Sequence, residues 1–192
     1  VLGNRMSIII AALISLIAIT ALVKLYDGEE PIMAWAAGLR TPRRAMELLT
    51  KYGRLPFWSL VALALLVMEQ YRAAVSLAIV IALSILFGRA LKELVRRPRP
   101  YEKLPLNAVK ASGSSYPSNH CSVVWGAALL VTSLLGPLWG IPLIIEAALV
   151  SISRILLLAH YPSDCIGGSL IGIITWRLGL IMYHAIAVFS II

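Results

Sequence analysis

Three short stretches of this sequence contain polar residues whose types suit the transfer of a phosphoryl group. Such a transfer needs cations that neutralise the phosphate oxygens, a nucleophile in line with the leaving group, and an acid that protonates the departing oxygen. Lys92, Arg99 and Arg154 can supply the positive charge, and the planar fork of arginine suits bidentate binding of phosphate. The stretches are KELVRRPRP, PSNH and SRILLLAHYPSD.

A histidine and an aspartate four residues apart form the candidate nucleophile. This spacing lets the carboxylate of Asp164 hold one ring nitrogen of His160 while the other nitrogen faces a substrate. Ser118 stands where an apolar run begins, so we expect it to cap a helix with its side chain. The free backbone amides of Asn119 and His120 would then point at an anion.

The same residues resemble, in order and spacing, the signature of the type 2 phosphatidic acid phosphatase (PAP2) superfamily, which reads K-x6-RP, PSGH and SR-x5-H-x3-D. One position departs from it, because Asn119 stands where the superfamily usually has glycine. The resemblance implies that His160 attacks phosphorus to form a phosphohistidine, that Asp164 fixes its tautomer, and that His120 protonates the leaving oxygen and then helps water to hydrolyse the intermediate. It also implies a set of phosphate-binding residues, which are Lys92, Arg99, Ser118, Asn119 and Arg154.

We expect neither a metal ion nor another cofactor. No group of Asp, Glu and His residues in the sequence has the spacing of metal ligands, and the one acid among the matched positions, Asp164, is assigned to His160. The vanadium haloperoxidases, which are related to this superfamily, bind vanadate at the same motifs. The resemblance therefore implies that vanadate inhibits by mimicking phosphate.

The composition predicts an all-α, polytopic membrane protein with one domain over residues 1–192. Apolar residues make up 60% of the chain and charged residues only 14%, which is far from the balance of a soluble protein. Apolar segments in lipid must be helical, and about 20 residues cross the hydrocarbon. We predict six transmembrane helices, at about 6–25, 55–71, 73–94, 118–138, 141–159 and 163–186.

The residues between the first two predicted helices, 24–54, mix apolar and basic side chains, which favours short interfacial helices lying on the membrane. Because the chain alternates direction, the connections after the first, third and fifth helices lie on one side, where the three stretches also fall. The net charge of +8 has almost no interleaved aromatic residues, so it suits a phosphate-bearing substrate or anionic lipid headgroups better than a nucleic acid.

Several charged residues have no place in the three stretches. We interpret Arg96 and Arg97 as contacts to lipid headgroups. Arg89 lies one turn before Lys92 and is either part of a structural ion pair or a support for the phosphate site. Glu146 and Arg177 lie at similar depths in neighbouring helices, so we predict that they pair, with separate partners as the alternative.

The two cysteines and the distribution of charge leave alternatives open. Cys121 and Cys165 are either small packing residues or a disulfide pair. Nearly all basic residues lie on the side of the three stretches, which favours a cytoplasmic site. Many prokaryotic members of the resembled superfamily work on the outer face instead. The exceptions to the charge distribution are Arg5, Arg72 and Arg177.

The resemblance implies an enzyme of the cell membrane that hydrolyses a lipid phosphate or diphosphate. Among its substrates we place polyprenyl diphosphate first, because its hydrolysis recycles a carrier that most prokaryotes need. Phosphatidylglycerophosphate, phosphatidate and lipid A phosphates are alternatives. A different class is a non-catalytic protein that binds or transports lipid phosphates. The expected partners are the lipid substrate and the bilayer, with no nucleic acid and no obligate protein partner.

Overall fold

The structure, a computed structural model, describes residues 2–26, 28–52, 55–104 and 112–189. These residues form helices and no strands. The long helices are α1 (Leu2–Leu25), α4 (Leu55–Val67), α5 (Tyr71–Val95), α7 (Asn119–Leu135), α8 (Pro137–Leu156) and α9 (Pro162–Phe189). The short helices are α2 (Glu30–Gly38), α3 (Arg43–Tyr52) and α6 (Pro100–Lys103).

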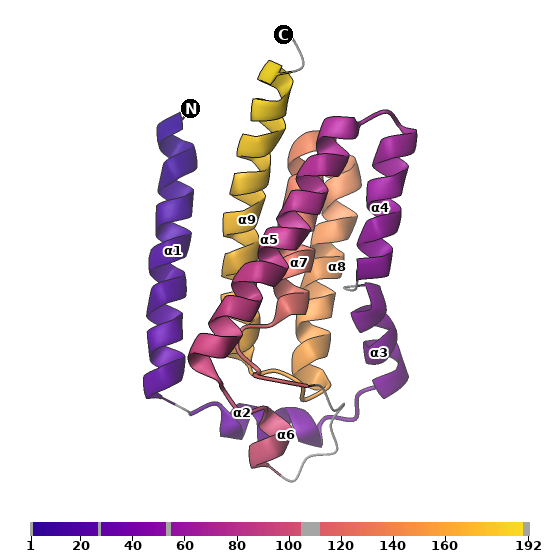
Figure 1. The fold of residues 1–192 in the computed structure, drawn as a ribbon. Helices are drawn as coiled ribbons and strands as arrows, with labels where there is room; N and C mark the ends of the chain where they lie inside the picture. The colour runs from indigo at the N-terminus through magenta and orange to yellow at the C-terminus, as the bar shows by residue number, and fades with distance from the viewer. Residues whose placement is uncertain (1, 27, 53–54, 105–111, 190–192) are drawn as a thin grey trace.

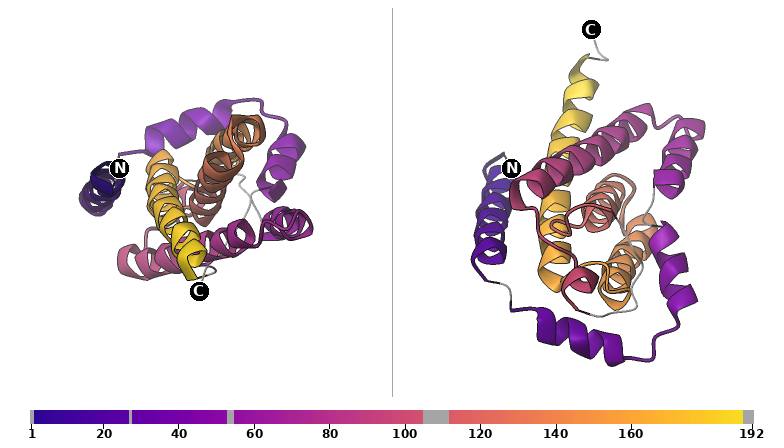
Figure 2. Two further views of the ribbon diagram at one scale, coloured as in Figure 1. Left: turned by 90° about the horizontal axis from the view of Figure 1, so that it is seen from above. Right: turned by 60° about the horizontal axis from the view of Figure 1, so that its bottom comes forward.

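The long helices stand side by side, and the short helices gather at one end of the bundle (Figure 1). The connections after α1, α5 and α8 all lie at that end, whereas α1 begins and α9 ends at the opposite end. Figure 2 shows α1 at the edge of the bundle and α2 and α3 curving around its base. The three polar stretches therefore lie at the same end of the molecule.

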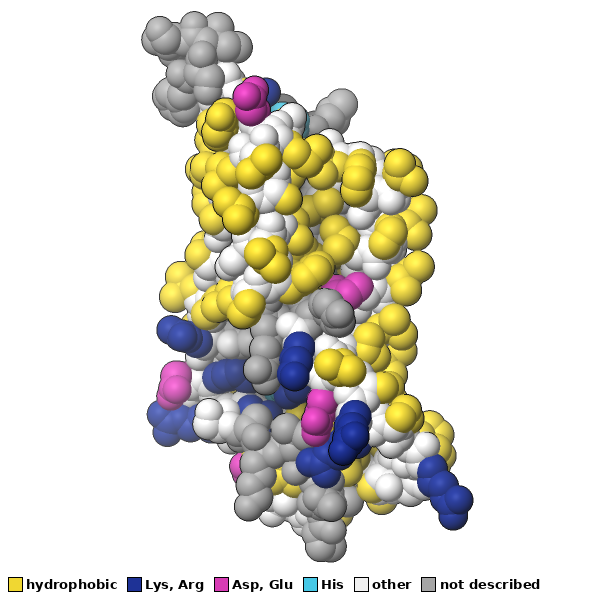
Figure 3. Space-filling model, turned by 90° about the vertical axis from the view of Figure 1, so that its right-hand side faces the viewer, with side chains coloured by type: hydrophobic (Ala, Val, Ile, Leu, Met, Phe, Trp, Pro, Cys, Tyr) yellow, Lys and Arg dark blue, Asp and Glu magenta, His cyan; other side chains and the backbone are white. Residues whose placement is uncertain are grey.

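Four of the described helices, α1, α5, α8 and α9, are long and apolar enough to cross a membrane. The apolar helices α4 and α7 are shorter, with 13 and 17 residues, and correspond to the second and fourth predicted spans. Hydrophobic side chains cover the upper part of the face in Figure 3, while Lys and Arg gather in its lower part. The chain is an integral membrane protein.

Helix α7 packs against α5, α8 and α9, and most of its residues are buried. It lies close to α9, where a Cβ atom added to Gly172 would lie 2.8 Å from the backbone nitrogen of Gly126. Small residues allow such close packing between helices in lipid, where burial of apolar surface drives little association. The fold thereby brings the first turns of α7 and α9 together.

Helix α8 differs from the predicted span 141–159 at both of its ends. It begins at Pro137 directly after Gly136, whose φ of 84° suits glycine and ends α7 sharply. It ends at Leu156, after which Leu158 has a left-handed φ of 57°. Residues 157–161 are consequently a tight connection, and His160 lies in it rather than on a helix.

The predicted ion pair between Glu146 and Arg177 is wrong. Both carboxylate oxygens of Glu146 are buried without a hydrogen-bond partner, and the guanidinium of Arg177 lies 4.0 Å from the ring centre of the neighbouring Trp176. Similar depth in two helices does not make their charged faces meet, because each helix is rotated by its own packing. Cys121 and Cys165 are both buried and free, so no disulfide joins α7 to α9.

Candidate functional site

Backbone hydrogen bonds join the three polar stretches below the ends of α5, α7 and α9. Helix α5 is capped by Arg96, whose left-handed φ of 52° turns the chain inward. The next residue, Arg97, then accepts a hydrogen bond from the amide of Ser115 at 2.9 Å. The amide of Ser118 donates to the carbonyl of Asp164, also at 2.9 Å. The candidate site is therefore built from segments that lie far apart in the sequence.

His160 is buried, and its orientation is set by two neighbours. Its Nδ1 lies 2.8 Å from the carbonyl oxygen of Ser115 and 3.5 Å from Oδ2 of Asp164. A carbonyl only accepts hydrogen bonds, so Nδ1 carries the proton and Nε2 keeps its lone pair. The nearer partner is thus a backbone carbonyl, where the sequence alone had suggested the carboxylate of Asp164.

The surroundings of His160 favour the neutral imidazole. Burial lowers the pKa of His160 from the usual 6.5 to about 4; the negative charge of Asp164 raises this pKa, and the positive charge of Arg154 lowers it. Neutral imidazole is the form that can attack an electrophile. At neutral pH His160 is therefore an uncharged ring of fixed orientation, which is what a nitrogen nucleophile requires.

We expect the pH profile of kcat/KM to reflect this lowered pKa. A neutral His160 should persist as the pH falls, and the activity that depends on it should be lost only near pH 4. The Asp164→Asn variant removes a negative charge that raises the pKa of His160. The acidic limb of its pH profile should therefore lie at lower pH than that of the wild-type protein. The measurement compares both proteins on one lipid phosphate, and a wild-type limb near pH 6.5 attributable to His160 would contradict it.

Asp164 is fully buried in the first turn of α9, and both of its oxygens are occupied. Oδ2 accepts a hydrogen bond of 2.8 Å from the amide of Tyr161, which satisfies a donor at the start of the helix. Oδ1 accepts a hydrogen bond of 2.8 Å from Nη1 of Arg97. These bonds fix the carboxylate beside His160.

Arg97 corrects the sequence-based interpretation, which placed it among lipid headgroups. Its guanidinium is buried over the ring of Tyr161, 3.8 Å from the ring centre, and bridges Asp164 to Glu29, with Nη2 2.9 Å from Glu29 Oε2. Glu29 also accepts hydrogen bonds from the amide and hydroxyl of Ser163. Arg96, by contrast, is exposed, and its contact with lipid headgroups stays a prediction.

Sequence reasoning missed Arg97 and Glu29 for different reasons. Arg97 looked like one more cation in a basic run, and only the left-handed turn at Arg96 directs it inward. Glu29 lies 68 positions before Arg97, and no motif or spacing links them. A useful signal was the proline after Arg97, because the residue before a proline rarely continues a helix.

The predicted phosphate-binding cations also hold the segment before α7. Nζ of Lys92 donates to the carbonyl of Ser114 at 2.7 Å. Arg99 is buried and donates to three carbonyls at 2.8–2.9 Å, those of Gly113, Ala159 and Ser112. Each terminal nitrogen of Arg99 carries a second N–H group that these three hydrogen bonds do not use. Arg154 is buried in the last turn of α8.

The start of α7 differs from expectation in one respect. Ser118 occupies the N-cap position, but its side chain makes no capping hydrogen bond and its buried Oγ has no hydrogen-bond partner in the described structure. The side chain of Asn119 lies against Gly88 of α5, because a Cβ atom there would collide with Oδ1 of Asn119. The glycine thus makes room for the residue at which the motif departs.

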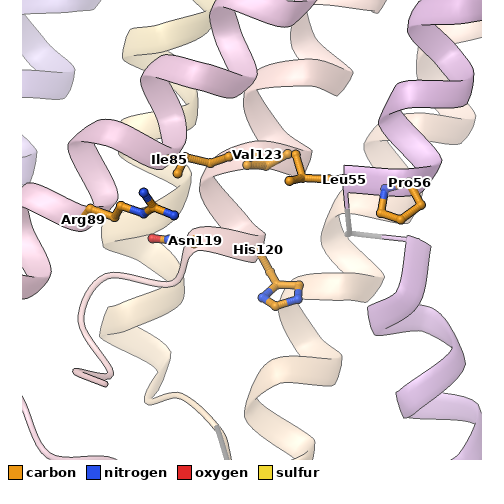
Figure 4. A pocket seen from close by; sticks show the side chains of 7 residues that line it. All are labelled: Leu55, Pro56, Ile85, Arg89, Asn119, His120 and Val123. Atoms are coloured by element: carbon orange, nitrogen blue, oxygen red, sulfur yellow. The ribbon is translucent and has the colours of Figure 1, made fainter. Parts of the chain in front are cut away.

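A pocket of about 510 Å³ lies beside the first turn of α7 and is also lined by α4 and α5. Figure 4 shows Arg89, Asn119 and His120 along it. His120 is half-buried in this pocket, whereas His160 is almost completely buried. The remaining lining is apolar and consists of Leu55, Pro56, Ile85 and Val123.

The chain matches the family model of the PAP2 superfamily over residues 73–187. It is 37% identical over 134 residues to an undecaprenyl-diphosphatase of Sulfolobus acidocaldarius, covering 66% of this chain and 64% of the relative. It is 39% identical over 84 residues to a decaprenylphosphoryl-5-phosphoribose phosphatase of Mycobacterium tuberculosis, covering 43% and 45%. The matched stretches thus span less than two thirds of these relatives.

Two solved structures share the fold. A transmembrane PAP2-type phosphatidylglycerolphosphate phosphatase from Bacillus subtilis has a TM-score of 0.79 at 21% sequence identity, covering 93% of this chain and 96% of that one. Aquifex aeolicus LpxE has a TM-score of 0.73 at 20% identity, covering 82% and 97%. At this identity the likeness concerns the arrangement of the helices.

Proposed function

Since the chain belongs to the PAP2 superfamily, we propose that it is a membrane-embedded, metal-independent phosphatase that hydrolyses a lipid phosphate or diphosphate through a phosphohistidine. The observation that carries this proposal is the state of His160. Its Nδ1 is bound to the carbonyl of Ser115, and burial keeps the ring neutral. A residue with a purely structural role would not need a free Nε2 beside buried cations.

Each predicted site residue has a role in the proposed reaction. Nε2 of His160 attacks phosphorus, and Asp164 stabilises the positive charge that develops on the ring. His120 protonates the leaving oxygen and then accepts a proton from the water that hydrolyses the phosphohistidine. The phosphate is held by Lys92, Arg99, Ser118, Asn119 and Arg154.

The proposed membrane arrangement has six crossing helices, with α4 and α7 completing the four longer ones, and α2 and α3 lying on the membrane surface. The two shorter helices are apolar, and they stand parallel to the other long helices (Figure 1). The pocket lined by α4, α5 and α7 has apolar walls and also contains the polar side chain of His120. A lipid tail can pack against these apolar side chains while its phosphate lies at the predicted phosphate-binding residues.

A polyprenyl diphosphate is the first choice of substrate. Both curated relatives are named for reactions on polyprenyl-linked compounds, and the identity to the first is 37%. Phosphatidylglycerophosphate, phosphatidate and lipid A phosphates remain the alternatives. A non-catalytic lipid-phosphate binder would need the cations but not an oriented, neutral histidine, so the geometry of His160 favours the enzyme.

The decisive experiment measures release of inorganic phosphate by the purified chain in detergent from a panel of lipid phosphates and diphosphates. We expect release that is unaffected by a metal chelator and inhibited by vanadate, with the largest kcat/KM on the polyprenyl diphosphate. The His160→Ala variant is the blank. A requirement for magnesium, or release that is equal in the blank, would contradict the mechanism.

A further inference from the structure

Arg89 is a cation of the pocket that the reaction described above does not use. It lies one helical turn before Lys92 on α5, and its side chain is exposed toward the pocket. Figure 4 shows its guanidinium pointing toward Asn119, with His120 further along the first turn of α7. Within the described part of the chain no carboxylate pairs with Arg89. Among the described residues, Arg89 therefore does not form the structural ion pair that was one of its two interpretations from the sequence.

The surroundings of Arg89 call for an anionic partner. Helix α5 is one of the helices that are long and apolar enough to cross the membrane, and charge within such a segment is costly unless it is paired or hydrated. The rest of the pocket wall is mostly apolar. Asn119 and His120 are the polar groups that share this wall with Arg89. Anion binding by the three groups would offset the cost.

We propose that Arg89 binds the phosphate of the leaving group when the substrate is a lipid diphosphate. The inference rests on the proposed function. His120 is the acid that protonates the leaving oxygen, so the leaving group must lie on the side of His120. That side is the pocket, where Arg89 is exposed. The apolar wall then takes the part of the tail next to the phosphate.

The bond changes explain why this contact would accelerate the reaction. A bond forms between Nε2 of His160 and the terminal phosphorus, while the bond from that phosphorus to the bridging oxygen breaks. The electron pair stays on the bridging oxygen, which leaves as part of a lipid monophosphate and is protonated by His120. Negative charge grows on the leaving phosphate, so Arg89 binds it more tightly in the transition state than in the ground state.

A lipid monophosphate offers Arg89 no such partner, because its leaving group is an alcohol. Arg89 should therefore determine specificity between diphosphates and monophosphates. This distinguishes it from Lys92, Arg99 and Arg154, which are proposed to bind the phosphate that reacts and should matter for both substrates.

The test compares a prenyl diphosphate with the prenyl monophosphate of the same tail, in purified wild-type protein and in Arg89→Met. We expect kcat/KM for the diphosphate to fall about thirtyfold and that for the monophosphate less than about threefold, as for the loss of one charge-assisted bidentate contact. Arg89→Lys should retain an intermediate diphosphate activity. Methionine keeps the length of the side chain, and a thermal unfolding scan checks the fold.

Arg96→Met is the matched control. Arg96 is an exposed arginine directly after the C-terminal end of α5, and it does not line the pocket that contains Arg89. This variant should leave both activities unchanged. Equal losses on both substrates in Arg89→Met, or no loss on either, would overturn the assignment of Arg89 alone. Absence of phosphate release by the wild-type protein from both substrates would instead refute the proposed function.

Discussion

Replacement of His160 by alanine is expected to reduce phosphate release by roughly 10⁴-fold or more, because it removes the nucleophile and not merely a binding contact. In the wild-type protein, quenching under alkaline conditions during turnover should trap phosphate on His160, since phosphohistidine survives base. The variant should show no such label. The measurement combines initial rates with mass spectrometry of the peptide that contains residue 160.

A second variant separates the chemical role of His160 from its structural one. Alanine also removes the hydrogen bond from Nδ1 to the carbonyl of Ser115, which can destabilise the buried connection. In His160→Asn the side-chain amide can keep this bond, but it is no nucleophile. It should unfold near the wild-type temperature and be as inactive as the alanine variant. Appreciable turnover by either variant would rule out the phosphohistidine.

Replacement of Arg97 by methionine should have the second largest effect, although Arg97 does not belong to the three-part signature. Its loss leaves the buried carboxylate of Asp164 and the partly buried carboxylate of Glu29 without their shared cation, which we expect to cost roughly 3–5 kcal/mol of stability. Asp164 would then be free to move relative to His160. In the protein that remains folded, kcat should fall about a hundredfold, with KM little changed, because Arg97 positions the site and touches no substrate.

The neighbouring arginine provides the control for this prediction. Arg96 is exposed, so Arg96→Met should leave both the unfolding temperature and kcat unchanged. Arg97→Lys keeps the charge but lacks the planar fork, so it should restore stability more than kcat. Adding Glu29→Gln to Arg97→Met removes one orphaned charge and should recover part of the stability. If Arg97→Met retained full kcat, Asp164 would not depend on Arg97 for its position.

The amino-acid sequence alone predicts the membrane class, the residue types of the candidate site and the end of the bundle at which they meet. Apolar runs of sufficient length predict helices, and alternating direction predicts which connections share a side. These features are local, so they can be found without knowing how the helices are rotated. The resemblance to the superfamily added the proposed roles of the histidines, and the match over residues 73–187 showed the family.

The partner of each side chain, in contrast, becomes visible only in the folded chain. The left-handed turn at Arg96 sends Arg97 inward to Asp164 and Glu29, and the early end of α8 lets His160 meet the carbonyl of Ser115. Glu146, by contrast, has no hydrogen-bond partner in the described structure. These partners could not be predicted because they depend on how each helix is rotated and how each loop is folded. Both are set by contacts between residues far apart in the chain.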